Sequence, residues 1–134
     1  MTRFVIGADV ALHLAQLKAV MPTSHRLLAP TLLRSQVLAE LFARVQRGEL
    51  DRKTAERQLD HLRALRLRLL GDRVLQGRAW DIAAQLGWPD TFMAEYIALT
   101  QLQANAFVCM EPALARAVIG IVKVASLDEL LGGS

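Results

Sequence analysis

Short, mostly apolar runs recur along the chain and predict buried strands. The clearest are residues 3–6, which Gly7 closes, and residues 106–110, with residues 121–124 as a last strand. Residues 26–29 form a second strand or an extended lead-in to the next helix. Apolar strands that alternate with helices are typical of a parallel sheet covered on both faces.

Helical periodicity fills the segments between these runs. The clearest helix covers residues 30–47, where apolar residues recur every four positions at Leu33, Val37, Leu41 and Val45. Further helices are predicted over residues 9–20, 52–70, 73–86, 88–103 and 113–118, and a Ser-x-x-Glu capping box at residues 126–129 predicts a final turn. The order predicts one three-layer α/β/α domain over residues 1–134, with a central, mostly parallel sheet.

The apolar content is high, and it changes what is expected of the surface. Hydrophobic residues make up 53% of the chain and the mean hydropathy is +0.27. The longest apolar runs, such as residues 118–122, are far shorter than the roughly 20 residues of a bilayer helix, and the first residues lack the pattern of a secretory signal. We therefore expect the apolar excess to be buried in a core, in a partner or in both. The single cysteine, Cys109, fits a reducing cytoplasm.

The positive charge is concentrated in the middle of the chain. The formal net charge is +3, and ten Arg or Lys residues lie between Arg44 and Arg78. Two interpretations remain open: these side chains form the solvated faces of helices, or they form a surface that contacts nucleic-acid phosphates.

Carboxylates near the predicted strand ends are the main candidates for chemistry, because the chain has no glycine-rich phosphate loop and no Cys/His spacing typical of zinc sites. Asp9 and Glu111 follow two predicted strands, and Glu40, Asp90 and Glu95 lie on predicted helices. Carboxylates that converge at strand ends are suited to Mg²⁺ or Mn²⁺, and such ions activate water for attack on phosphate. From spacing alone, helix caps and solvated faces explain these residues better. Cys109, in an apolar run, is interpreted as a structural thiol.

Four segments together point to a known family. They are an apolar strand followed by small and acidic residues at 4–12, a strand leading into a helix at 27–37, a Tyr-x-Ala-Leu helix at 92–99, and a strand followed by Glu-Pro at 107–117. In this combination the chain resembles the PIN domain, specifically the VapC-like toxins of type II toxin–antitoxin systems. The resemblance covers nearly the whole chain.

The resemblance implies a Mg²⁺- or Mn²⁺-dependent endoribonuclease that a cognate antitoxin neutralises and that is usually dimeric. It also implies four acidic positions, which fall in this sequence on Gly7, Gln36, Met93 and Glu111. Only Glu111 still carries a carboxylate. The family's acidic metal site is therefore either displaced or lost.

Each vacated position has a carboxylate nearby, within about one helical turn along the chain. The resulting candidates for both catalysis and metal binding are Asp9, Glu40, Asp90 and Glu111. If they reach a common ion, the protein is a divergent endoribonuclease. If they do not, it is a catalytically inactive PIN-like protein that binds an antitoxin-type partner or RNA without cleaving it.

A third interpretation sets the family aside and makes the chain an α/β subunit of a hetero-complex with no role on nucleic acid. For partners we expect an antitoxin that lays an amphipathic segment on the apolar faces of the helices at residues 30–47 and 52–70. A homodimer, or a hetero-oligomer with the antitoxin, is also expected, and no membrane contact is.

Overall fold

The computed structural model describes residues 1–132, and within them a five-stranded parallel sheet forms the centre of the molecule. The strands lie in the order β3-β2-β1-β4-β5, and every pairing is parallel. Their bounds are β1 (Thr2–Ile6), β2 (His25–Pro30), β3 (Arg68–Leu70), β4 (Ala106–Val108) and β5 (Val124–Ala125). The predicted α/β class with a parallel sheet is thus confirmed.

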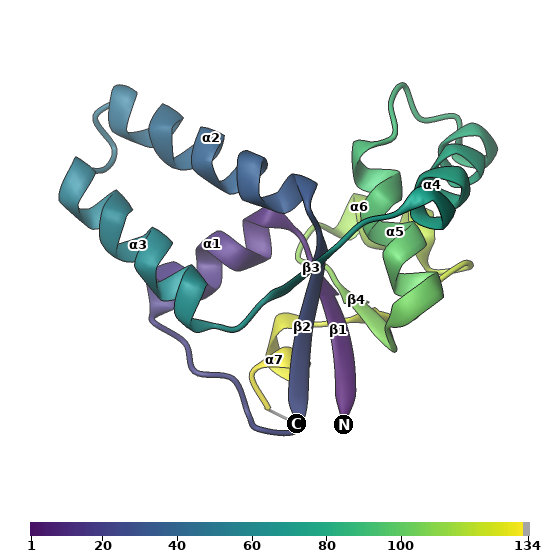
Figure 1. Cartoon of the computed structure of the whole chain (residues 1–134), viewed down its shortest axis with the longest axis horizontal. Helices are drawn as coiled ribbons and strands as arrows, with labels where there is room; N and C mark the ends of the chain where they lie inside the picture. The colour runs from purple at the N-terminus through teal and green to yellow at the C-terminus, as the bar shows by residue number, and fades with distance from the viewer. Residues whose placement is uncertain (133–134) are drawn as a thin grey trace.

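Helices cover both faces of this sheet. They are α1 (Ala8–Leu17), α2 (Leu32–Gln46), α3 (Arg52–Ala64), α4 (Arg73–Leu86), α5 (Phe92–Gln103), α6 (Pro112–Val118) and α7 (Leu127–Leu130). Figure 1 shows α1, α2 and α3 on one side of the strands and α4, α5 and α6 on the other. None of the described helices combines the length and the apolar content that a bilayer-spanning segment requires.

The core joins the buried strands to helices on both sides of the sheet, above all to α1 and α5. Val5 and Ile6 of the central strand are fully buried, and so are Val10 and Leu14 on α1. Residues 96–100 of α5 are all buried, because this helix lies between α4 and strands β1, β2 and β4. Burial all around explains why α5 has no clear polar face in the sequence.

Several predicted boundaries differ by up to about four residues, as where α5 begins at Phe92 and β4 ends at Val108, and two predicted elements are wrong. The segment 52–70 is not one helix, because α3 ends at Ala64, Arg66 takes a left-handed conformation with φ 56°, and Arg68–Leu70 pairs with β2 as an edge strand. The last strand comprises Val124 and Ala125, because the N–H groups of Ile121 and Val122 bond back to the carbonyl of Val118 and extend the turn after α6. The predicted capping box of α7, between Ser126 and Glu129, is present.

Candidate functional site

An open pocket of about 580 Å³ lies at the carboxyl ends of β1 and β4, where ligands bind in parallel α/β sheets. Side chains from α1, α2, α5 and the start of α6 surround it. The lining residues are Ala8, Asp9, Leu12, Gln36, Ala39, Glu40, Arg44, Met93, Tyr96, Glu111 and Leu114. The pocket therefore gathers segments that lie more than 100 residues apart in the sequence.

Three of the four predicted acids line this pocket, and they are Asp9, Glu40 and Glu111. Asp90 does not. It lies on the exposed turn before α5, where its carboxylate accepts a hydrogen bond from the backbone N–H of Phe92 at 3.1 Å. The structure thus assigns Asp90 a local role at the start of the helix and brings the other three acids to one place.

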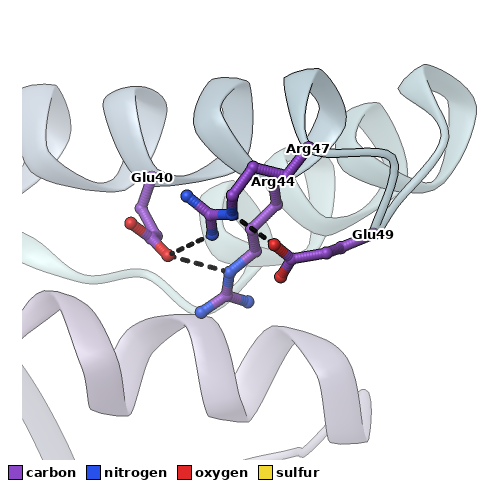
Figure 2. Close-up of polar contacts among 4 residues, drawn as sticks. All are labelled: Glu40, Arg44, Arg47 and Glu49. Atoms are coloured by element: carbon purple, nitrogen blue, oxygen red, sulfur yellow. Dashed lines mark hydrogen bonds and ion pairs between the residues drawn. The ribbon is translucent and has the colours of Figure 1, made fainter.

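Glu40 points to arginines of its own helix. Its Oε1 lies 3.1 Å from Nε of Arg44 and 3.6 Å from Nη2 of Arg47, as Figure 2 shows. Arg47 also pairs with Glu49, and this hydrogen bond raises the pKa of Arg47 and lowers that of Glu49. The Glu40 carboxylate is therefore already neutralised by two guanidinium groups, which compete with any cation for its oxygens.

The Asp9 carboxylate lies close to the point where a side chain at position 7 would begin. Gly7 is buried and extended directly before α1, and a Cβ built on it would approach Oδ1 of Asp9 to 3.0 Å. The same oxygen accepts a hydrogen bond from the N–H of Val10 at 2.8 Å. The absence of a side chain at Gly7 and the placement of the Asp9 carboxylate are therefore sterically coupled.

A part-buried hydrogen bond joins two of the residues that line the pocket, Tyr96 and Gln36. Tyr96 on α5 is 1% exposed, and its hydroxyl donates to Oε1 of Gln36 on α2 at 2.5 Å. Burial raises the pKa of Tyr96 well above its ordinary value, and the charges of Glu95 and Asp9 raise it further. Tyr96 is therefore a neutral donor at any physiological pH, and it holds the amide oxygen of Gln36.

Two more titratable groups have a raised pKa. Burial raises the pKa of Glu95. The sequence pattern had placed this residue on a different helix face from Met93. Burial also raises the pKa of the Cys109 thiol, and Asp9 and Glu111 add to this effect. The Cys109 Sγ donates to the backbone carbonyl of Glu111 at 3.2 Å. These contacts support the interpretation of Cys109 as a structural thiol.

Sequence reasoning had not identified Tyr96 and Arg44 as residues of the site. Arg44 had a usable signal, because it follows Glu40 by four positions, the spacing of an ion pair on a helix. The Tyr96–Gln36 contact joins residues 60 positions apart, so only the packing of α5 against α2 brings them together.

The pocket does not fit a Mg²⁺ or Mn²⁺ centre as its side chains lie. Such ions need several converging oxygen ligands with little competing positive charge. Across residues 1–132, no three or more His, Cys, Asp and Glu side chains are grouped so that they could hold a metal ion. Glu40 is engaged with Arg44, and Gln36 offers a neutral amide oxygen that already accepts a hydrogen bond.

Comparisons with known proteins identify the fold. No protein-family model matches the chain, and no curated protein matches it. Among solved structures, PAE2754 from Pyrobaculum aerophilum is similar with a TM-score of 0.76 and 19% identity, over 98% of this chain and 93% of that one. VapBC2 from Rickettsia felis, bound to a DNA fragment from their promoter, is similar with a TM-score of 0.57 and 15% identity, over 92% and 98%. The chain therefore has a PIN-like fold.

Proposed function

We propose that this protein is the VapC-like component of a toxin–antitoxin pair and that it acts by binding an antitoxin-type partner without cleaving RNA. The observation that carries the proposal is the state of the pocket. At two of the family's acidic positions Gln36 and Met93 offer no carboxylate, and Gln36 is engaged by Tyr96. The neighbouring acid Glu40 is held by Arg44 and Arg47.

The similarity to VapBC2 supports the same class of protein, because it extends over 92% of this chain. In such a pair the PIN-like member needs a surface that fits its antitoxin. Such a surface is compatible with the changed pocket, because the two use different faces of α2: Gln36, Glu40 and Arg44 line the pocket, and Leu38, Leu41 and Phe42 line the groove.

The partner surface is the apolar groove between α2 and α3, where the sequence pattern had predicted it. Leu38 and Phe42 on α2 are 56% and 65% exposed although they are large apolar residues. Two adjoining hollows continue this surface, and they are lined by Leu33, Val37, Leu38, Leu41, Phe42, Val45, Ala55, Leu59, Leu62, Leu67 and Leu69. Arg34, Arg52, Glu56 and Arg63 also line them, and Arg52 pairs with Glu56 while Arg63 pairs with Asp60. This apolar pattern fits the apolar face of an amphipathic helix.

Partner binding is tested by co-expressing the whole chain with any small protein that a neighbouring gene encodes. Phe42→Asp is expected to weaken the complex by about tenfold or more, since it puts a charge into an apolar contact. Ile119→Asp is the matched control, because Ile119 is 69% exposed at the end of α6, which Figure 1 shows on the other side of the sheet. Equal weakening of the complex by both variants, or no weakening by either, would contradict the assignment of the groove.

A second candidate is the divergent endoribonuclease, because Asp9, Glu40 and Glu111 line the same pocket. This activity requires the Glu40 carboxylate to break its ion pairs with Arg44 and Arg47. A catalytic role for Asp90 stays a prediction. The test is RNA cleavage by highly purified protein with Mn²⁺, compared with the Asp9→Asn and Glu111→Gln variants. Cleavage that both substitutions abolish would overturn the binding-only proposal. Binding of RNA without cleavage, weakened by salt, would support the prediction of a basic RNA-contacting surface.

A further inference from the structure

A hollow of about 640 Å³ lies between α1 and α3. We call it the α1–α3 hollow, and it is lined by Ala15, Gln16, Lys18, Thr54, Arg57, Gln58, Asp60 and His61. None of these residues lines the strand-end pocket or the α2–α3 groove. Its volume lies within the range of about 300–1,000 Å³ that is usual for the binding sites of small ligands.

The hollow lies apart from both of those surfaces because it uses other parts of the same helices. On α1 it uses the end of the helix, whereas the strand-end pocket uses the first half, which follows β1. On α3 it uses the face that contains Thr54 and His61, whereas the groove uses the face that contains Ala55 and Leu59. Figure 1 shows α1 and α3 side by side on one side of the sheet.

The α1–α3 hollow is positively charged. Lys18 and Arg57 line it, and neither of them takes part in the ion pairs of residues 1–132. Asp60 is the carboxylate among the lining residues, and it is paired with Arg63 at 2.6 Å. Two unpaired cations beside a carboxylate that is already neutralised favour an anionic ligand.

The Arg57 guanidinium has donors to spare for such a ligand. Its Nη2 donates to Oγ1 of Thr54, one turn earlier on α3, at 3.3 Å. Hydrogen bonds from Thr54 lower the pKa of Asp51, and the charge of Arg57 adds a smaller effect on that pKa. A guanidinium carries five N–H groups in a planar fork that matches two oxygens of a phosphate. Arg57 is therefore suited to binding phosphate through two hydrogen bonds.

The backbone places Lys18 where helices usually end in glycine. Lys18 ends α1 in the left-handed conformation with φ 54°, which glycine adopts more readily because it has no Cβ. His61 of α3 donates from Nε2 to the carbonyl oxygen of Ala19 at 2.8 Å, and this holds the chain after Lys18 against α3. Unfavourable backbone conformations that the surrounding structure holds in place are concentrated at functional sites.

Gln58 adds a polar atom that is incomplete within the chain. Among the buried side-chain nitrogen and oxygen atoms of residues 1–132, its Oε1 is the one without a hydrogen-bond partner. Buried polar atoms nearly always have a partner, so this acceptor calls for a donor. A phosphate monoester near its second pKa of about 6 carries both negative charge and an O–H donor.

We propose that the α1–α3 hollow binds a small phosphate monoester. Lys18 and Arg57 hold the charged phosphate oxygens, and Gln58 accepts a hydrogen bond from the protonated one. The rest of the hollow takes the organic part of the molecule. The site shares no lining residue with the α2–α3 groove, so ligand binding and the proposed partner binding can fail separately.

The first test is calorimetric titration of the whole chain with inorganic phosphate and with adenosine 5′-monophosphate, at about pH 6 and about 0.15 M NaCl. Both are expected to bind, the nucleotide more tightly. Arg57→Ala is expected to weaken binding by about tenfold or more, since it removes the bidentate contact. Arg116→Ala is the matched control, because Arg116 is an exposed arginine of α6, which Figure 1 shows on the other side of the sheet.

Three outcomes of this titration would overturn the proposal. The first is that neither phosphate nor the nucleotide binds. The second is that Arg57→Ala and Arg116→Ala weaken binding equally. The third is that an RNA oligonucleotide without terminal phosphates binds in a way that Arg57→Ala weakens, while the nucleotide does not bind. The hollow would then contact a nucleic-acid backbone and not a monoester.

The second test compares two cations that share one backbone conformation. Arg66, like Lys18, is left-handed, with φ 56°, but it does not line the hollow. Lys18→Gly and Arg66→Gly are both expected to raise the melting temperature, because glycine relieves the left-handed backbone. Only Lys18→Gly is expected to weaken binding of the nucleotide, by about fivefold or more. A Lys18→Gly protein that is stabilised and binds as tightly as the wild type would refute the role of Lys18.

The third test concerns the hydrogen bond to Gln58. The wild type is expected to bind inorganic phosphate more tightly than sulfate at about pH 6, because sulfate has no O–H to donate. Gln58→Leu is expected to abolish this preference. It is also expected to raise the melting temperature of the unliganded protein, because it removes a buried acceptor without a partner. Equal binding of phosphate and sulfate by the wild type would refute the role of Gln58.

Discussion

The strand-end pocket and the outward helix faces differ in how their side chains are partnered. In the pocket, Tyr96 bonds Gln36, Glu40 is held by Arg44, and Asp9 accepts a backbone N–H. On the outward faces, large apolar side chains such as Phe42 and Trp80 lie exposed.

This difference indicates which surfaces of the molecule can gain free energy when they bind another molecule. A pocket whose polar groups already have partners must lose those contacts before it can hold a ligand, which costs about 1 kcal/mol or more for each one. An exposed apolar side chain gains free energy when any suitable partner covers it. This contrast favours the proposed partner binding over chemistry in the pocket.

The largest expected effect comes from restoring the family's acids. The triple variant Gly7→Asp, Gln36→Glu, Met93→Asp is expected to lower the free energy of unfolding by about 3 kcal/mol without metal, because like charges then crowd a partly buried site. Saturating Mn²⁺ is expected to restore about 2.7 kcal/mol at one hundred times the dissociation constant. The measurement is chemical denaturation with and without Mn²⁺. A similar Mn²⁺ effect on the wild type would break the comparison, because its own pocket would then bind metal.

The next effect concerns the hydrogen bond between Tyr96 and Gln36 in the pocket. Tyr96→Phe removes the donor that satisfies Gln36, and we expect a loss of about 1.5 kcal/mol in the free energy of unfolding. Trp80→Phe changes an exposed aromatic residue on α4, and for dilute monomer we expect less than about 0.5 kcal/mol. Both are measured by urea denaturation at neutral pH. Equal losses of unfolding free energy would show that the Tyr96–Gln36 hydrogen bond stabilises the fold no more than the exposed Trp80 side chain does.

Two glycines give a matched pair on the outward surfaces. A Cβ at either Gly77 or Gly48 would meet nothing within 4 Å, but Gly48 has a φ of +75°. Gly77→Ala is expected to stabilise the dilute monomer by about 1 kcal/mol, because alanine is the better helix residue. Gly48→Ala is expected to destabilise it by about 1 kcal/mol, because L-residues avoid left-handed backbone. Thermal unfolding measures both changes in stability. Changes of the same sign in the two variants would contradict the comparison.

The smallest effect is one of pH. Burial raises the pKa of Glu95 above its unfolded value, so the free energy of unfolding falls as pH rises through the folded pKa. Glu95→Gln removes this penalty, and we expect it to stabilise the protein at neutral pH. The gain should disappear as pH falls below the ordinary glutamate pKa of about 4.3. Glu56→Gln, at an exposed residue paired with Arg52, is the control and should give no such gain.

Much of the fold could be predicted from periodicity, because its buried strands and amphipathic helices have distinct patterns. Residues 4–6 and 106–108 are apolar because β1 and β4 are buried there on both faces. β3 could not be predicted, since it is a three-residue edge strand and Leu59, Leu62 and Leu65 before it keep a helical spacing. Only pairing with β2 makes that short segment extended.

The candidate site could be predicted in part, for a similar reason. Asp9 and Glu111 follow strands, and parallel strands end at one edge, so their common location followed from the pattern of elements. Glu40 reaches the same pocket from α2, one turn beyond Gln36. What the pattern could not reveal is which groups are already satisfied, since contacts such as that of Tyr96 with Gln36 depend on how separate helices pack.

The strand order has a consequence for how the chain is made. β1 pairs on one side with β2, which follows within some 20 residues, and on the other side with β4, which begins at Ala106. At synthesis rates of about 5–20 residues per second, one edge of β1 waits roughly 5–20 s for its neighbour. During that interval an apolar strand has unpaired backbone groups, which are prone to aggregation. Slowing translation before Ala106 should therefore lower the yield of soluble protein more than slowing it after β5.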